Sequence, residues 1–586
     1  MISFKEKPQA YFYRYPLVLF ILLFQNNVVH AQCDMIFIHG FENSQVIKSE
    51  CAPFATTAST SRFLSRATFG ATQGDIDAFS GSDVSNWMID QFNKPAHDTY
   101  KVDFVNQVDN EGIPLDHHIV NSRFMDDTIA ADDQLRERVI FALSQIVVIS
   151  NLGNLENFDI PMAEYHDILA TNAFGNYKDI LKQVSRSPAM AMYLTFLKNQ
   201  KGDLILNTQP DENYAREIMQ LFSVGLVELN LDGSLKLDSQ GMPIQTYGID
   251  DIKGLAKVFT GFSYDSNDFF FNISNSCASA DTCPVLRLSI KLFPVYRSSL
   301  EKSFLGTTIA AGTDGNTSVD MAIDAIFNHP NVAPFVGRQL IQRFVTSNPK
   351  PAYINRVSNA FESGQYILPN GTIVGTGIRG DLKATIAAVL LDVNAYREPL
   401  NVSNQFGKVT EPYIRFTAWA RAFNETTPEI GREAFGDVRG DLRQRPFLSS
   451  SVFNFFRPGY SAPNTLTGNA SLQAPELQLA NSSSVLDYIN FMNVYIYQRN
   501  GSVVPDPNAG IVVDYSAQMA IASDAVALVD NLDLLLTGNR LTNNTKSEII
   551  AIVNQISTAD GDFALRKRVH IATSLVMTSV EFLVQR

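Results

Sequence analysis

Arginine and glutamate side chains at helical spacing stand out in the stretch from Pro210 to Asn230. The polar residues on one narrow stripe of this predicted helix are Asn213, Arg216, Glu217 and Gln220. A carboxylate beside a guanidinium can exchange a proton with a substrate, or it can form an ion pair that ties elements together. Arg216 and Glu217, with Glu212 one turn earlier, are therefore candidate catalytic residues, and structural ion pairing is the interpretation that we favour.

Arg136 is a further candidate catalytic residue and a candidate buried charge. On its predicted helix it lies in the middle of an apolar arc formed by Val139, Ile140, Ala142, Leu143, Ile146 and Val147. A buried guanidinium needs a carboxylate or equivalent hydrogen bonds. We expect Arg136 to approach the core and to pair with a carboxylate, for which Glu212 or Glu217 would serve.

Histidines and nearby carboxylates give only weak candidates for a metal site. These candidates are Glu164, His166 and His329, with Asp167 and the pair His117 and His118 as further acid or base groups. Glu164 and His166 are two residues apart and so do not share a helical face, and His329 precedes Pro330, which first marks a helix boundary. The zinc-protease, nucleophile-elbow, Walker and EF-hand patterns are absent from the sequence. We predict no cofactor and leave a metal open.

Two other segments imitate binding sites. Gly375, Gly377 and Gly380 form a GxGxxG pattern before Asp381, but no βαβ series surrounds it and Asp381 would repel a pyrophosphate. We therefore expect a turn capped by Asp381. The aromatic segment 453–460, with Phe453, Phe455, Phe456 and Tyr460, is either a recognition platform or, as we favour, a plug that fills the core under loops.

The elements that position these residues are mostly helices. Pro210 and the acidic residues after it start the helix of the polar stripe, Gly225 ends it, and the Asp232-Gly233 turn predicts a short hairpin. A second hairpin is expected around Asn370-Gly371. Further helices are predicted over 72–79, 132–148, 163–169, 177–184, 250–260, 319–327, 333–345 and 381–391, and four more segments complete the chain.

The predicted fold class is therefore mainly α, a multi-helical body with a few short β-hairpins and long irregular loops. The largest loop is a Ser-, Asn- and aromatic-rich excursion over 263–315. A second loop-rich region covers 445–481. We expect residues 32–61 to form an N-terminal linker and residues 62–586 to form one large domain.

The N-terminus carries the pattern of a secretory signal peptide over residues 1–31. Basic residues precede the apolar run from Leu17 to Phe24, and Val-His-Ala ends at Ala31. The apolar run is shorter than a membrane span, and no later segment is long and uncharged enough to be one. The mature chain is thus expected to be soluble and exported, either periplasmic or extracellular. A net charge of −14 argues against a nucleic-acid partner.

Four cysteines in an exported chain favour disulfides over a metal site. Their grouping predicts two local pairs, Cys33 with Cys51 and Cys277 with Cys283, among three possible pairings.

Several motifs together resemble a known family. They include Arg62 to Gly70, Leu135-Arg136-Glu137-Arg138, Asp211 to Glu217, Phe259-Thr260-Gly261, His329-Pro330, Arg379-Gly380-Asp381 and Ser579 to Phe582. Through them the chain is similar to the bacterial family catalogued as domain of unknown function 1800 over nearly its whole mature length. The resemblance implies an exported, mainly helical protein of unestablished role, often encoded beside an exported sulfatase- or phosphatase-like protein, which is the possible partner.

One departure from the family pattern bears on function. Many members carry a Trp-His-x-His-Phe segment whose paired histidines would suit a metal, whereas this chain has Leu143 to Val147, with Ser144 and Ile146 in place of the histidines. Any role of that pair is lost here. We expect a binding or assembly component of the cell envelope, with an exported enzyme, metal-assisted or based on the Glu and Arg pair, as the alternative.

Overall fold

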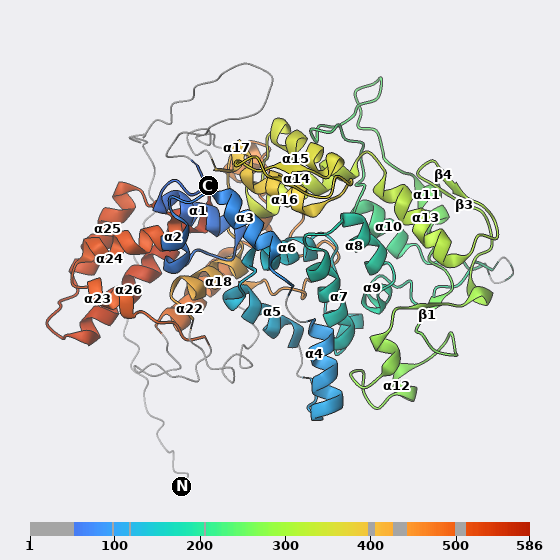
Figure 1. Ribbon diagram of the computed structural model, residues 1–586, viewed down its shortest axis with the longest axis horizontal. Coiled ribbons are helices and arrows are strands. Elements are labelled where there is room, and N and C mark those ends of the chain that lie inside the picture. Colours follow the sequence, from blue (N-terminus) through green and yellow to red (C-terminus); the bar gives the residue numbers. More distant parts are fainter. Residues whose placement is uncertain are drawn as a thin grey trace, which may run out of the picture.

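The computed structural model describes residues 52–586 except 97–98, 116–118, 204, 206, 397–404, 426–441 and 498–510. Within this part the chain forms helices joined by loops, with two-stranded antiparallel sheets (Figure 1). The mainly α prediction is confirmed. No helix in these ranges is long and apolar enough to cross a membrane. The predicted signal peptide, the pair Cys33 and Cys51, and His117 and His118 lie outside the described residues.

The helices fall into three consecutive groups. The first comprises α1 (Thr57–Ala67), α2 (Gln73–Phe79), α3 (Val84–Asn93), α4 (Tyr100–Asn106), α5 (Ile119–Ala130), α6 (Gln134–Ser144), α7 (Asp159–Asn172), α8 (Tyr177–Val184), α9 (Pro188–Tyr193), α10 (Asn213–Gln220) and α11 (Ile249–Ala256). The second comprises α12 (Ile273–Ser276), α13 (Gly315–Phe327), α14 (Val332–Phe344), α15 (Pro351–Ser363), α16 (Leu382–Leu391), α17 (Val393–Tyr396) and α18 (Pro412–Ala422). The third comprises α21 (Leu466–Asn469), α22 (Ser482–Ile496), α23 (Ser516–Ile521), α24 (Ala525–Leu532), α25 (Asn543–Asn554), α26 (Asp562–Met577) and α27 (Val580–Leu583).

Local capping explains why several helices begin where the sequence predicts. The Thr72 side chain accepts a hydrogen bond from the backbone of Asp75 and caps α2, and Asp381 accepts from Ala384 and caps α16. Asp381 also accepts from the backbone N–H of Thr376 at 2.8 Å, so the glycine pattern before it is a capped turn, as expected. Helix α6 ends at Ser144, before the predicted Val148.

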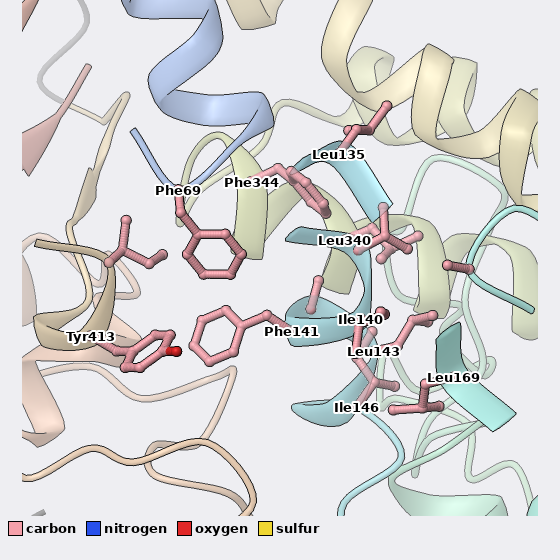
Figure 2. Packing of buried hydrophobic residues seen from close by; sticks show 14 of the residues in the cluster. Phe69, Leu135, Ile140, Phe141, Leu143, Ile146, Leu169, Leu340, Phe344 and Tyr413 are labelled. Carbon is pink, nitrogen blue, oxygen red and sulfur yellow. The ribbon is translucent and has the colours of Figure 1, made fainter. Parts of the chain in front are cut away.

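Helix α6 lies in the middle of the core (Figure 2). All of its residues are buried. Phe141 packs with the ring of Tyr413 of α18 at 5.4 Å and with the ring of Phe69 at 5.7 Å. A helix buried all round has to accommodate its charged residues inside the protein, which gives Arg136, Glu137 and Arg138 of α6 unusual surroundings.

The packed body begins before residue 62. Phe54 is buried, and its ring lies 5.3 Å from that of Phe63 and 6.2 Å from that of Trp87. Helix α1 already starts at Thr57. The last residues of the expected linker therefore belong to the core, and the division of the chain into domains stays a prediction.

Short sheets join segments near and far in sequence. They are β1 (Phe262–Ser263) with β2 (Lys291–Leu292), β3 (Lys302–Phe304) with β4 (Thr307–Ile309), β5 (Tyr366–Ile367) with β6 (Ile373–Val374), and β7 (Lys408–Val409) with β8 (Val584–Gln585). The pair β5 and β6 is the hairpin predicted around Asn370-Gly371. The excursion over 263–315 is largely irregular, yet it holds the unpredicted hairpin β3–β4 and the predicted disulfide between Cys277 and Cys283. It lies at the opposite end of the molecule from α23 to α26 (Figure 1).

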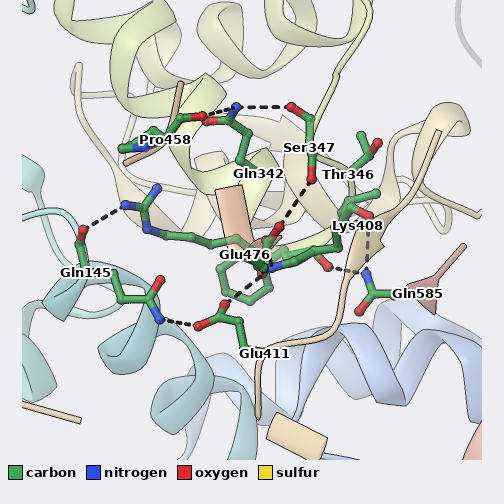
Figure 3. Close-up of polar contacts among 12 residues, drawn as sticks. Gln145, Gln342, Thr346, Ser347, Lys408, Glu411, Pro458, Glu476 and Gln585 are labelled. Carbon is green, nitrogen blue, oxygen red and sulfur yellow. Dashed lines mark hydrogen bonds and ion pairs between the residues drawn. The ribbon is translucent and has the colours of Figure 1, made fainter. Parts of the chain in front are cut away.

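A fully buried ion cluster joins remote segments (Figure 3). Lys408 Nζ lies 3.3 Å from Glu411 Oε1 and 3.2 Å from Glu476 Oε1. Gln145 and Gln444 each donate to Glu411 Oε2 at 2.6 Å. Lys408 and Arg138 lower the pKa of Glu411 against the opposing effect of its burial, while burial raises the pKa of Glu476. The cluster therefore holds the C-terminal end of α6, β7, the start of α18 and the segment 444–476 against one another.

Candidate functional site

Helix α10 carries the predicted polar stripe and is fixed by its apolar side. The helix begins at Asn213, with Glu212 as its N-cap residue, close to the start expected from Pro210. The ring of Tyr214 stacks on that of Phe196 at 4.4 Å and meets the ring of Phe259 edge-on at 4.7 Å. Because Tyr214, Ile218 and Met219 are buried, the opposite stripe is held in one orientation.

Gly225 ends this stretch and directs the chain into a β-ribbon. Its φ of +77° is the left-handed conformation expected at a helix end, and its N–H donates to the Met219 carbonyl at 2.8 Å. The hairpin predicted around Asp232-Gly233 is confirmed by the bridge between Leu229 and Leu235. A third segment, which we did not predict, adds bridges between Leu237 and Pro243 and between Val227 and Gln245.

The ribbon over 226–246 and the first residue of α11, Ile249, expose large apolar side chains. These are Leu226, Leu235, Leu237, Met242 and Ile249, which are 47–60% exposed. We call these five residues the apolar ribbon. Its base is anchored, because Asn331 accepts from the Leu229 N–H at 2.9 Å and donates to the Val227 carbonyl at 2.7 Å. The exposed side chains are thus presented on a fixed support.

Arg216 and Glu217 do not form the ion pair that we favoured. Arg216 is 41% exposed and its Nη2 lies 3.2 Å from Glu212 Oε2. Glu217 is buried, and its Oε2 has no hydrogen-bond partner among the described residues. Burial raises the pKa of Glu217, and the charge of Arg216 opposes this effect only in part. A protonated carboxyl at this position can donate a hydrogen bond to a ligand or act as a general acid.

Two tyrosines complete the surroundings of Glu217. Burial raises the pKa of both Tyr193, at the end of α9, and Tyr247, just before α11, to about 12, and the charge of Glu217 contributes to both shifts. The Tyr247 hydroxyl is buried and, within the described ranges, has no hydrogen-bond partner. We call Glu217, Tyr193 and Tyr247 the Glu217 site. Sequence reasoning missed both tyrosines, because no local pattern links residues 193, 217 and 247.

Arg136 is buried as predicted, but the expected partner was wrong. Its Nε lies 3.0 Å from Asp133 Oδ2, and its Nη atoms donate to the carbonyls of Lys94 at 2.7 Å and Ala170 at 3.0 Å. Neither Glu212 nor Glu217 contacts it. Arg136 therefore fastens α6 to α7 and to the end of α3, and it does not join the Glu217 site.

The three candidate metal ligands lie apart. Glu164 pairs with Lys101 at 3.1 Å, and His166 is buried with its ring stacked on that of Tyr100 at 3.8 Å. His329 follows α13, as its position before Pro330 predicts; its Nδ1 accepts from the Asn331 N–H at 3.2 Å, and burial lowers its pKa. No group of three metal-ligating side chains in the described part of the chain is placed to hold an ion.

The aromatic segment 453–460 is partly buried, as the plug interpretation expects, and its use for recognition stays a prediction. Phe456 is buried and belongs to the interior, whereas Phe453 is 36% exposed and lies under the guanidinium of Arg457 at 5.1 Å. The segment is therefore anchored by one ring and shows another at the surface.

A family model described as "Protein of unknown function (DUF1800)" matches residues 62–584. No curated protein and no solved structure matches the chain.

Proposed function

The chain belongs to the DUF1800 family, and on this premise we propose that it is an exported binding or assembly component of the cell envelope. The basic and apolar pattern of residues 1–31 supports export. The apolar ribbon is the observation that carries the binding role.

Exposed apolar residues gathered on one segment are typical of surfaces that bind another protein. Water would otherwise hydrate five large apolar side chains within a stretch of 24 residues, from Leu226 to Ile249. The support under them is anchored to the helical body, since the Gly233 turn packs against Ile354 of α15 and Asn331 holds the base. The partner that we propose is the exported sulfatase- or phosphatase-like protein that the family resemblance implies.

The test is the affinity of the purified mature chain for that protein, measured by isothermal titration calorimetry. We expect the double variant Leu235→Asp, Leu237→Asp to weaken binding by at least about tenfold, because charges would enter an apolar interface. The matched control is Leu466→Asp, on an 89% exposed residue of α21, which should bind like the unchanged chain. Equal affinity of the ribbon variant, or no complex at all, contradicts the proposal.

An exported enzyme is the second candidate, and the Glu217 site is the observation that favours it. A buried carboxyl with a raised pKa, an uncommitted Oε2 and a neighbouring uncommitted phenol is a common arrangement for a general acid. Under this hypothesis the mature chain hydrolyses some member of a panel of 4-nitrophenyl esters and glycosides. The hydrolysis is expected to fall as pH rises through the pKa of Glu217 and to disappear in Glu217→Gln. Activity that survives this substitution would exclude Glu217 as the acid.

A further inference from the structure

A small cavity lies between α4, α5, α6 and α7. It belongs neither to the apolar ribbon nor to the Glu217 site. Its volume is about 10 Å³, roughly the room that one water molecule requires. Thr99 and Thr171 line it and are exposed, so the cavity borders the surface. Its other polar walls are Tyr100, Asp127, Glu137, His166 and Asp167.

Two of these lining residues, Asp167 and Tyr100, already form hydrogen bonds within the protein. Asp167 accepts from the backbone N–H groups of Tyr100 at 2.9 Å and Lys101 at 3.0 Å, and so caps the start of α4. The Tyr100 hydroxyl donates to Asp127 Oδ2 at 2.5 Å. Burial and the charge of Asp127 raise the pKa of Tyr100, which therefore stays a neutral donor.

His166 and Glu137 have buried polar atoms without a hydrogen-bond partner among the described residues. His166 is 3% exposed, and neither ring nitrogen has a hydrogen-bond partner in the part of the chain that the structure describes. The nearest carboxylate contact joins Nδ1 to Asp167 Oδ1 at 3.6 Å, beyond hydrogen-bond range. Glu137 is 2% exposed, and its Oε2 likewise lacks a described partner. Buried polar atoms of this kind normally have partners, so the cavity offers acceptors to a missing donor.

We propose that this cavity binds the –NH₃⁺ head of a primary ammonium ligand. Such a head has about the size of the cavity and carries three N–H donors, and the acceptors that line the cavity include Glu137 Oε2, an acceptor nitrogen of His166 and the Asp127 carboxylate. The lining residues include three carboxyl groups and no lysine or arginine. The same carboxyl groups would repel an anion, and a metal ion lacks three suitably placed ligands in the described chain.

Binding of the cation is coupled to a proton on Glu137. Burial, together with the charges of Asp127 and Asp133, raises the pKa of Glu137, and Arg136 opposes this shift. Around Asp127, the Arg123 guanidinium lies at 3.7 Å and itself faces Asp103 at 3.8 Å. A bound ammonium favours the Glu137 carboxylate and so opposes this upward shift of its pKa, and a proton held by Glu137 passes to the solvent when the cation binds. Affinity consequently rises with pH until Glu137 is ionised in the empty site.

The probe is methylammonium chloride, added to the mature chain labelled with ¹³C-histidine and followed by NMR at pH 6, 7 and 8. The His166 signal is assigned by its loss in His166→Asn. We expect a saturable shift of this signal with an affinity on the order of millimolar, as a two-heavy-atom ligand allows. The affinity should increase with pH. Tetramethylammonium, which has no N–H donor and is larger, should leave the signal unchanged.

Glu137→Gln keeps the size of the side chain and removes the titrating group. It should lower the affinity for methylammonium at pH 8 by about tenfold and make the affinity less dependent on pH than in the unchanged chain. The matched control Leu466→Asp, on the exposed residue of α21, should behave like the unchanged chain. An unshifted His166 signal, an equal response to tetramethylammonium, or a pH dependence in Glu137→Gln as steep as that of the unchanged chain would each overturn the proposal. Should Glu137→Gln fail to fold, the comparison of the two ammonium ions on the unchanged chain still decides it.

Discussion

Three consecutive charged residues of α6, Arg136, Glu137 and Arg138, contact three different parts of the protein interior. Arg136 binds Asp133 and the carbonyls of Lys94 and Ala170, and Glu137 lines the small cavity. Arg138 donates to the Arg343 carbonyl at 2.7 Å, beside the ion cluster. Successive helical residues point about 100° apart, so one buried helix directs its charged side chains to several sides. Burial lowers the pKa of Arg138 to about 10, at which it remains charged at neutral pH.

Glu411 is the residue on which the ion cluster depends most. Glu411→Gln would remove the charge that faces Lys408 at 3.3 Å and would disturb the hydrogen bonds from Gln145 and Gln444. We expect the free energy of unfolding to fall by about 3–5 kcal/mol, because a buried ammonium loses a counter-ion. Urea denaturation of the mature chain measures this change. The control is Asp90→Asn in the exposed pair with Lys94, which should change stability by less than about 1 kcal/mol; similar losses for the two variants would contradict this role.

Lys302 makes stability depend on pH in the alkaline range. Its side chain is buried, Nζ donates to the Leu300 carbonyl at 2.7 Å, and burial together with Arg297 and Lys257 lowers its pKa to about 8. In the unfolded chain a lysine titrates near 10.4, so between about pH 8 and pH 10.4 the unfolded state binds more protons and stability rises with pH.

Lys302→Met should therefore be more stable than the unchanged chain at pH 7. Its stability should also lack the increase above pH 8 that Lys302 causes in the unchanged chain. Thermal unfolding between pH 7 and pH 10 checks both effects. Lys567→Met, on an exposed residue of α26, is the control and should keep the rise. A Lys302→Met chain that is less stable at pH 7 would mean that the buried ammonium stabilises the fold.

Among the elements, the junction of α10 with the ribbon depends on Gly225. A Cβ there would stand 2.9 Å from the ring of Phe335, and the φ of +77° is unfavourable for any other residue. Gly225→Ala should lower the free energy of unfolding by about 2–4 kcal/mol, the sum of backbone strain and the clash. Gly81 has a similar φ of +80° but open space around it, so Gly81→Ala reports the backbone contribution alone. Chemical denaturation of both variants tests this difference, and equal losses would show that Phe335 moves aside.

Elements with local signals were predictable and elements made by distant contacts were not. The caps Thr72 and Asp381 and the Asp232-Gly233 turn act within a few residues, so their patterns identify them. The β3–β4 hairpin was missed because its turn places Leu305, and not a typical turn residue, at a φ of +48°. The pair β7–β8 joins residues 408 and 585, which no local pattern connects.

The Glu217 site was likewise predictable only where local sequence patterns determine it. The orientation of Glu217 is a property of α10 and of its apolar residues, whereas Tyr193 and Tyr247 reach it only through tertiary packing. Arg136 is the instructive error: we looked for a distant carboxylate and overlooked Asp133, one helical turn earlier.

At the scale of the whole molecule, export is a prediction of its own. The mature chain recovered from the host envelope should begin at Gln32, because the pattern of residues 1–31 ends in a cleavage site. Intact mass spectrometry with and without a thiol reductant checks both this start and the predicted disulfides. A chain that retains Met1 to Ala31 and stays in the cytoplasm would contradict the proposed place of action.

The proposed partner surface has one direct test, hydrogen exchange of the backbone amides with and without the exported sulfatase- or phosphatase-like protein. Binding at the apolar ribbon should slow exchange over residues 226–246 and leave distant helices such as α25 unchanged. Unchanged exchange over the ribbon, or protection confined to another face of the molecule, would contradict the account.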